Sequence, residues 1–223
     1  MRQPEFIHTY GVMGSGKTMA AIQRQMTLAR RKYVYAITKP SEDWRGGQTI
    51  TTRFGEVSRP IDFTTSKDDS LIERTMQTLA AKERLRDVGS AAANLALIID
   101  EVNFMSPAQV AEANTLVNDY GVNVYTFGIS TDFLGNPFPG EQAARTFADR
   151  TLELQADCYG WRDDGDCSND ASYNARLVNG IYVFQGDQVA INEEGEETTK
   201  EAVTIYRSLC RACYEIARLE SQR

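Results

Sequence analysis

The sequence lacks several features that would assign it at once to a class of protein. No apolar run approaches the length needed to cross a membrane, and the N-terminus has no signal-peptide pattern, so we expect a cytoplasmic protein without a membrane partner. There is no internal repeat, and positive charge is not in excess, because the net charge is −7. A negative net charge argues against nonspecific electrostatic binding of nucleic acid, although it is compatible with a local basic groove.

The composition that remains is that of a globular protein. The chain has 223 residues, of which 42% are hydrophobic and 25% charged. This length suits one sizeable domain, or a domain with a small appendage.

A glycine-rich stretch near the N-terminus carries the first functional signal. Residues 10–20 read YGVMGSGKTMA and fit the pattern G-x-x-x-x-G-K-[ST]. In such a loop the backbone N–H groups surround phosphates, Lys17 reaches the terminal phosphates and the Thr18 hydroxyl can ligate Mg²⁺. The apolar run 5–10 before it predicts a strand and 18–31 after it a helix, as the motif requires. We therefore expect the phosphates of a nucleotide at Gly11, Met13, Gly14, Ser15, Gly16, Lys17 and Thr18.

The rest of the chain alternates between strand-like and helical patterns. Strands are expected at 32–38, 94–100 and 122–128, helices at 70–86 and 106–120, and a long loop with little regular structure at 39–67. The alternation predicts an α/β fold, with a parallel sheet of the P-loop (RecA-like) kind and helices on both faces. Short β-like runs and a last helix at 213–220 follow, so we expect a nucleotide-binding domain at 1–150 and a small domain at 151–223. The acidic run 192–201 is expected to be a solvated or mobile loop.

Two carboxylates follow the buried strand LALII. The carboxyl ends of parallel strands meet the ligand in open α/β sheets, so Asp100 and Glu101 are expected near the phosphates. Asp100 can hold Mg²⁺ or its water, and Glu101 can act as a general base. The alternative is an ordinary pair of surface carboxylates at a strand end.

The four cysteines form a third candidate site. Cys210 and Cys213 make a C-x-x-C pair just before a helix, and Cys158 and Cys167 lie upstream. Four thiolates can close a tetrahedral structural Zn²⁺ site. Free buried cysteines or a redox pair are the alternatives.

In order, these motifs resemble the type II thymidine kinases, the cytosolic family that contains zinc. The similarity covers nearly the whole chain. The matching pieces are Met13 in the P-loop, KPSEDWR at 39–45, TTRFG at 51–55, DEVNF at 100–104, GISTDFLGNPF at 128–138, Cys167 with Ala171 and Arg176, and Tyr206 ahead of Cys210, Arg211 and Cys213.

This resemblance implies a reaction and roles for the residues. The γ-phosphate of ATP would pass to the 5′-hydroxyl of thymidine, with deoxyuridine as a second acceptor. Glu101 would be the base, Lys17 and Arg45 would balance charge, and Asp43 or Asp100 would act with Thr18 on Mg²⁺, with Asn103 nearby. The nucleoside would be enclosed by Met13, Phe104, Ile129, Phe133, Phe138, Asn174 and Tyr206. The resemblance further implies a structural Zn²⁺ on Cys158, Cys167, Cys210 and Cys213, a homotetramer or dimer, and a role in nucleotide salvage for DNA synthesis.

The chain departs from the family pattern at four places. Asn103 replaces the usual Gln, Ile129 replaces Leu, residues 159–166 widen the spacing between two cysteines, and the segment 192–205 is long and acidic where the family has a short Gly-Gly loop. Three other functions are compatible with parts of the sequence. They are a P-loop ATPase with a zinc ribbon acting on nucleic acid, a member of the same family that acts on another deoxynucleoside or has lost activity, and a nucleotide-gated binding module.

Overall fold

The computed structural model describes residues 3–43, 47–52, 57–85, 94–162, 165–186 and 203–222. The chain divides into two compact units, each with its own sheet. The first unit comprises Met1–Tyr10, Gly16–Ile129 and Phe138–Leu154, and the second comprises Gly11–Ser15, Ser130–Pro137 and Gln155–Arg223. The domain boundary expected at residue 150 stays a prediction. Arg45 and the acidic run 192–201 lie outside the described residues.

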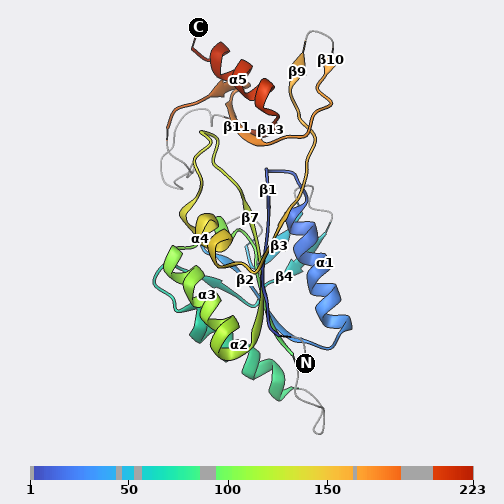
Figure 1. Cartoon of the computed structure of the whole chain (residues 1–223), viewed down its shortest axis with the longest axis vertical. Helices are drawn as coiled ribbons and strands as arrows, with labels where there is room; N and C mark the ends of the chain where they lie inside the picture. The colour runs from blue at the N-terminus through green and yellow to red at the C-terminus, as the bar shows by residue number, and fades with distance from the viewer. Residues whose placement is uncertain are drawn as a thin grey trace. The chain divides into compact units, whose positions relative to one another are not determined.

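The first unit is built on a six-stranded sheet (Figure 1). Its order is β5-β2-β6-β7-β1-β8, and the ladders β5–β2, β2–β6, β6–β7 and β1–β8 are parallel. The strands span Phe63–Thr65 (β5), Val34–Pro40 (β2), Leu95–Ile99 (β6), Val122–Ile129 (β7), Phe6–Gly11 (β1) and Arg150–Glu153 (β8). The predicted parallel sheet is confirmed.

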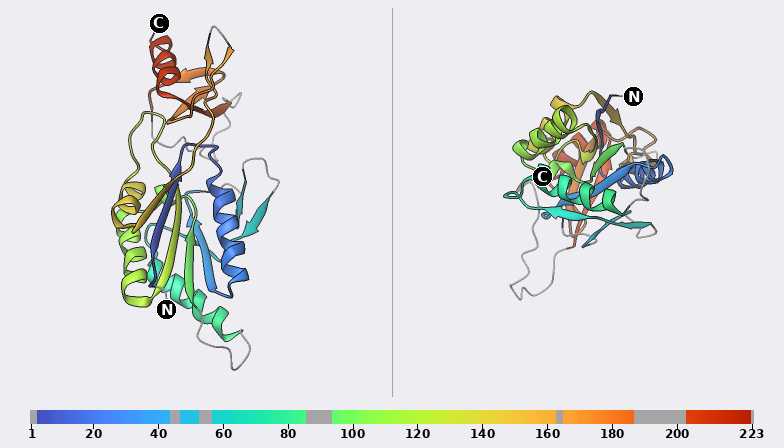
Figure 2. Two further views of the ribbon diagram at one scale, coloured as in Figure 1. Left: turned by 45° about the vertical axis from the view of Figure 1, so that its right-hand side comes forward. Right: turned by 90° about the horizontal axis from the view of Figure 1, so that it is seen from below.

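Helices cover both faces of this sheet, as the two views in Figure 2 show. Helix α1 (Lys17–Arg30) packs Ala21, Ile22 and Leu28 on one face. The opposite face is covered by α2 (Leu71–Arg84), α3 (Pro107–Tyr120) and α4 (Pro139–Phe147). Strand β6 lies between the two layers, and its residues 96–99 are fully buried, as its continuous apolar sequence predicts.

Local sequence signals set the ends of helix α3. Ser106 forms a capping box with Gln109, and Pro107 occupies the first helical position. The helix ends at Gly121, which adopts the left-handed conformation (φ 69°) and turns the chain directly into β7. The helix therefore begins and ends where its own sequence dictates.

Two segments differ from the sequence interpretation. The expected loop 39–67 contains β3 (Thr49–Thr51) and β4 (Ser58–Pro60), which pair antiparallel, as well as the edge strand β5. These strands are only three residues long, too short for an alternating pattern to be recognised, and their buried Ile50 and Phe63 anchor them. Residues 139–153, for which the sequence predicts no helix or strand, form α4 and the exposed edge strand β8.

The second unit contains a three-stranded antiparallel sheet and one helix. β11 (Tyr173–Val178) lies between β12 (Ile181–Val183) and β13 (Thr204–Leu209), and helix α5 (Arg211–Glu220) follows β13. A small hairpin pairs β9 (Trp161–Arg162) with β10 (Gly165–Asp166), within the segment that widens the cysteine spacing. The core of this unit joins the four cysteines to Ala175, Leu209, Tyr214 and Ala217.

Among the described residues, no helix is both long and apolar enough to cross a membrane.

Candidate active site

The predicted phosphate-binding loop lies between β1 and α1, as its motif requires. Gly14 and Gly16 both have positive φ angles, 80° and 84°, in the region that L side chains rarely adopt. A Cβ on Gly16 would meet nothing within 4 Å, so the need for glycine there is conformational. Gly16 is also the N-cap of α1 and provides no capping side chain, which suits a helix N-terminus that receives phosphate. Lys17 is the first residue of this helix and is buried.

The predicted carboxylate pair follows directly after β6. Asp100 is only 5% exposed, and its backbone N–H donates to the carbonyl of Thr38 on the neighbouring strand (3.0 Å). Glu101 is half-buried and has a φ of 53°, a left-handed conformation that is uncommon for a residue with a side chain. Such a conformation marks a position under functional or packing constraint.

The electrostatics of Asp100 reflect this crowded, buried position. Burial, and then the negative charges of Glu101 and Asp43, raise the pKa of Asp100 to about 7, while the N–H of Glu101 and the charge of Lys17 act in the opposite direction. A cation placed here would relieve the repulsion between the carboxylates. The charges of Asp43 and Lys17 therefore both act on Asp100 within the first unit, while a shared role of the three residues at the phosphates stays a prediction.

Strand β2, which neighbours β6, contributes a buried ion pair. Lys39, 1% exposed, places Nζ 3.2 Å from Oδ2 of Asp43, which is also buried. The pairing of Thr38 with Ile99 places the carboxyl ends of the two strands at the same edge of the sheet. The family resemblance implies a role for Asp43 but none for Lys39, because nothing in the sequence shows that a lysine at a strand end is buried.

Asn103 supplies a polar group beside this edge. Its Oδ1 accepts a hydrogen bond from the backbone N–H of Ile129 at the end of β7 (3.1 Å). Its Nδ2 is buried and has no hydrogen-bond partner among the described residues. A buried donor of this kind is satisfied by water or a ligand oxygen, which fits the expectation that Asn103 serves the site.

The aromatic residues expected around the nucleoside fall in both units. In the first, Phe104 and Phe138 meet edge to face, with ring centroids 5.8 Å apart. In the second, Phe133 is fully buried, with the Arg176 guanidinium 3.7 Å from its ring centre. Tyr206 lies on β13 opposite Arg176 and is half-buried. Their contact with a substrate stays a prediction.

The remaining residues expected at the nucleoside, Met13 and Asn174, touch each other within the second unit. The N–H of Met13 donates to Oδ1 of Asn174 (2.8 Å). This contact joins the phosphate-binding loop to strand β11, a link that the sequence does not reveal.

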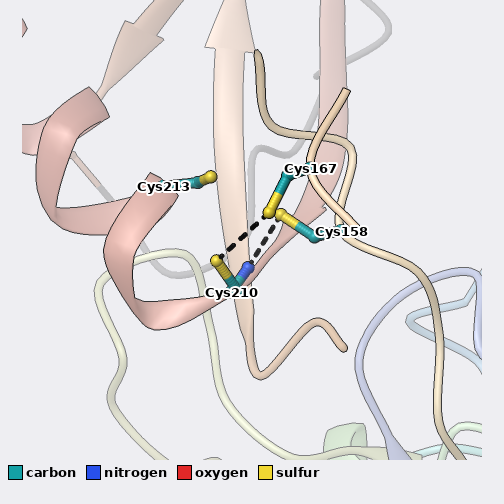
Figure 3. Close-up of side chains that lie close together, drawn as sticks. All are labelled: Cys158, Cys167, Cys210 and Cys213. Carbon is teal, nitrogen blue, oxygen red and sulfur yellow. Dashed lines mark hydrogen bonds between the residues drawn. The ribbon is translucent and has the colours of Figure 1, made fainter. Parts of the chain in front are cut away.

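The four cysteines converge in the second unit (Figure 3). Their sulfur atoms all lie within 4.8 Å of one another, and all four residues are buried and free of disulfide bonds. The sulfurs of Cys167 and Cys210 are 3.8 Å apart. That is about the edge of a tetrahedron with Zn–S bonds of about 2.3 Å, so the donor set fits Zn²⁺. The cluster could therefore hold a metal ion.

Backbone N–H groups donate hydrogen bonds to one of the cysteine sulfurs. Cys158 Sγ accepts hydrogen bonds from the N–H groups of Gly160 (3.3 Å) and Cys210 (3.1 Å). Burial raises the pKa of the Cys158 thiol to about 12. Burial also favours a higher pKa for the Cys210 thiol. Hydrogen bonds from the Cys213 N–H and the Asn169 amide outweigh this effect and lower the pKa of Cys210 to about 6. The cluster thus contains a group that favours the thiolate form that metals bind.

Comparison with known proteins agrees with the motifs. A protein-family model described as "Thymidine kinase" matches residues 5–214. A thymidine kinase of Streptomyces coelicolor is 30% identical over 208 residues, covering 93% of this chain and 87% of the relative. The thymidine kinase of Enterobacteria phage T4 is 28% identical over 207 residues, covering 92% of each chain. A solved genome packaging NTPase, B204 from Sulfolobus turreted icosahedral virus 2, is 14% identical with a TM-score of 0.40 over 74% of this chain and 79% of its own, a similarity too low to bear on function.

Proposed function

The chain belongs to the thymidine kinase family, and we propose that it transfers the γ-phosphate of ATP to the 5′-hydroxyl of thymidine, with deoxyuridine as a second acceptor. The observation that carries the proposal is the position of Asp100 and Glu101 directly after β6, in the same unit as Lys17. A P-loop alone binds phosphate; a carboxylate at this strand end adds a base for the acceptor.

We assign the proton transfer to Glu101. Its carboxylate accepts the proton of the 5′-hydroxyl as that oxygen forms a bond to the γ-phosphorus. The bond from phosphorus to the β–γ bridging oxygen breaks, and ADP leaves with the electron pair. Lys17, and Arg45 by the family resemblance, offset the charge on the transferring group. Glu101 suits this role because it is more accessible than Asp100.

The residues present also fit a divalent cation. Asp43 and Asp100 are buried carboxylates, and Thr18 offers a hydroxyl in the first turn of α1. These residues would hold Mg²⁺ directly or through water, and the ion would supply positive charge to offset that of the ATP phosphates. Asn103 Nδ2, buried and available, would donate to a water or to a substrate oxygen in this region.

For the nucleoside we propose contacts with side chains that keep water from the reacting groups. The proposal rests on the family resemblance and on the aromatic side chains of Phe104, Phe133, Phe138 and Tyr206. Met13, Ile129 and Asn174 belong to it by the resemblance alone, and both ends of the Asn174 amide are bound within the protein. We also propose that the four-cysteine cluster holds a structural Zn²⁺, supported by its sulfur spacing. A homotetramer or dimer, a cytoplasmic location, a role in nucleotide salvage and the absence of a nucleic-acid partner rest on the family resemblance alone.

The test is phosphoryl transfer from ATP across a panel of nucleosides, with products identified by mass. We expect thymidine and deoxyuridine monophosphates from wild-type enzyme, and no transfer to deoxycytidine, deoxyadenosine or deoxyguanosine. Transfer to one of those three instead would redefine the substrate. ATP hydrolysis stimulated by DNA, without transfer to any nucleoside, would support a nucleic-acid ATPase and overturn the proposal.

A further inference from the structure

The first half of the phosphate-binding loop is attached to the C-terminal sheet. Residues Gly11–Ser15 belong to the second unit, together with strands β11 and β13. We propose that Asn174 and Ser208 are positioning residues of this loop, which hold the Met13 peptide so that the loop is formed before ATP arrives. The inference rests on the proposed function in taking ATP as the phosphate donor.

Asn174 uses both ends of its side-chain amide within the protein. Its Oδ1 accepts from the N–H of Met13 and its Nδ2 donates to the carbonyl of Thr131, each at 2.8 Å. The residue is 2% exposed. It therefore bridges two segments that are 118 positions apart (131 − 13), the phosphate-binding loop and Ser130–Pro137.

Ser208 binds the carbonyl of Met13, the residue whose N–H is bound by Asn174. Its hydroxyl donates to the carbonyl of Met13, and the residue is buried. Ser208 and Asn174 are directly paired across β13 and β11. Both hydrogen-bonding groups of the Met13 backbone are thus bound by two adjacent side chains on one antiparallel ladder.

The position of Met13 explains how its two hydrogen bonds can affect ATP binding. Met13 lies between Val12 and Gly14, and the N–H of Ser15 donates back to the Val12 carbonyl (3.3 Å) to form a tight turn. The N–H of Ser130 also donates to the carbonyl of Gly11 (3.3 Å). A glycine-rich loop without such anchors has many accessible conformations, and a ligand that orders it loses affinity by that entropy. Anchoring it in advance lowers this cost.

Two other roles for Asn174 make different predictions. If Asn174 contacted the base directly, its replacement would change thymidine binding, and Ser208 would be dispensable. If both residues served stability alone, their loss would lower the melting temperature and leave the affinities of the folded enzyme intact. A positioning role requires that either replacement weakens ATP binding in enzyme that is still folded.

The decisive variants are Ser208→Ala, which removes only the donor to the Met13 carbonyl, and Asn174→Asp, which keeps an acceptor for the Met13 N–H but loses the donor to Thr131. Ser168→Ala and Asn118→Asp make the same changes at exposed positions and serve as controls. ATP binding is measured by calorimetry without nucleoside, alongside KM for ATP, KM for thymidine, kcat and melting temperature.

We expect ATP to bind about 5- to 10-fold more weakly to each variant, the effect of about one lost hydrogen bond, with the controls unchanged. Unchanged ATP affinity in Ser208→Ala would overturn the proposal, whatever happens to stability. A rise in KM for thymidine confined to Asn174→Asp would instead assign Asn174 to the base. If Asn174→Asp does not fold, Ser208→Ala decides alone. Because ATP binding is measured without a nucleoside, wild-type protein that binds ATP but phosphorylates no thymidine would refute only the proposed function.

Discussion

The backbone N–H of Glu101 donates a hydrogen bond to Oδ1 of Asp100, with 3.1 Å between the two atoms. Through this contact, two carboxylates that are adjacent in the sequence are held in different environments. Asp100 is buried, with its pKa raised to about 7, whereas Glu101 is half-buried and sits in a left-handed backbone conformation. The difference supports separate roles, with Asp100 serving the cation and Glu101 accepting the proton.

Replacement of Glu101 by Gln tests this division. Glu101→Gln keeps the shape and removes the base, so we expect kcat to fall by roughly two to four orders of magnitude, with ATP and thymidine binding retained. Steady-state kinetics and calorimetry measure the two effects. Glu83→Gln, on the exposed face of α2, is the matched control. Near-normal turnover in Glu101→Gln would remove Glu101 from the mechanism.

The buried pair of Lys39 and Asp43 predicts a stability effect. Lys39→Met removes the cation 3.2 Å from a buried carboxylate, and we expect the free energy of unfolding to fall by about 3 kcal/mol. The control is Lys67→Met, which breaks a 3.7 Å pair with Glu42 at an exposed position and should cost less than about 1 kcal/mol. Urea unfolding measures both. Equal effects would mean that the burial of Lys39 contributes nothing.

The cysteine cluster predicts metal content. We expect about one zinc per chain and a lower melting temperature after each Cys→Ser change, because structural zinc contributes folding free energy directly. Metal analysis and thermal unfolding, with and without a chelator, test this. A purified protein without zinc, or Cys158→Ser that retains all of it, would refute the assignment.

Gly160 lies so close to the cysteine cluster that a larger residue at this position would collide with a sulfur. A Cβ at this position would lie 2.4 Å from Cys213 Sγ, so Gly160→Ala should displace a ligand sulfur and reduce zinc retention. Gly180→Ala is the comparison in the same unit: a Cβ there meets nothing within 4 Å, and only its φ of 82° is strained, which costs about 1 kcal/mol. With a competing chelator, zinc release should be faster from Gly160→Ala than from wild type, and unchanged in Gly180→Ala. Equal release from the two variants would show that the contact is relieved without moving Cys213.

Local patterns in the sequence were sufficient for much of the fold. The P-loop, the apolar strand β6 and the helix at 106–120 were predicted because each depends on neighbours within a few positions. Strands β3, β4 and β5, helix α4 and edge strand β8 were not. They are short or exposed, so tertiary contacts, rather than a periodic pattern, define them.

By itself the sequence determined the family, the carboxylate pair after β6 and the four cysteines, because residue types at fixed spacing carry that chemistry. Only the tertiary structure decided that Lys39 is buried against Asp43, and that Asn174 and Ser208 hold Met13. The contacts to Met13 join residues 161 and 195 positions apart. They run from a side chain to the backbone, and because every residue except proline has the same backbone N–H and carbonyl, such contacts leave no pattern in the order of residues.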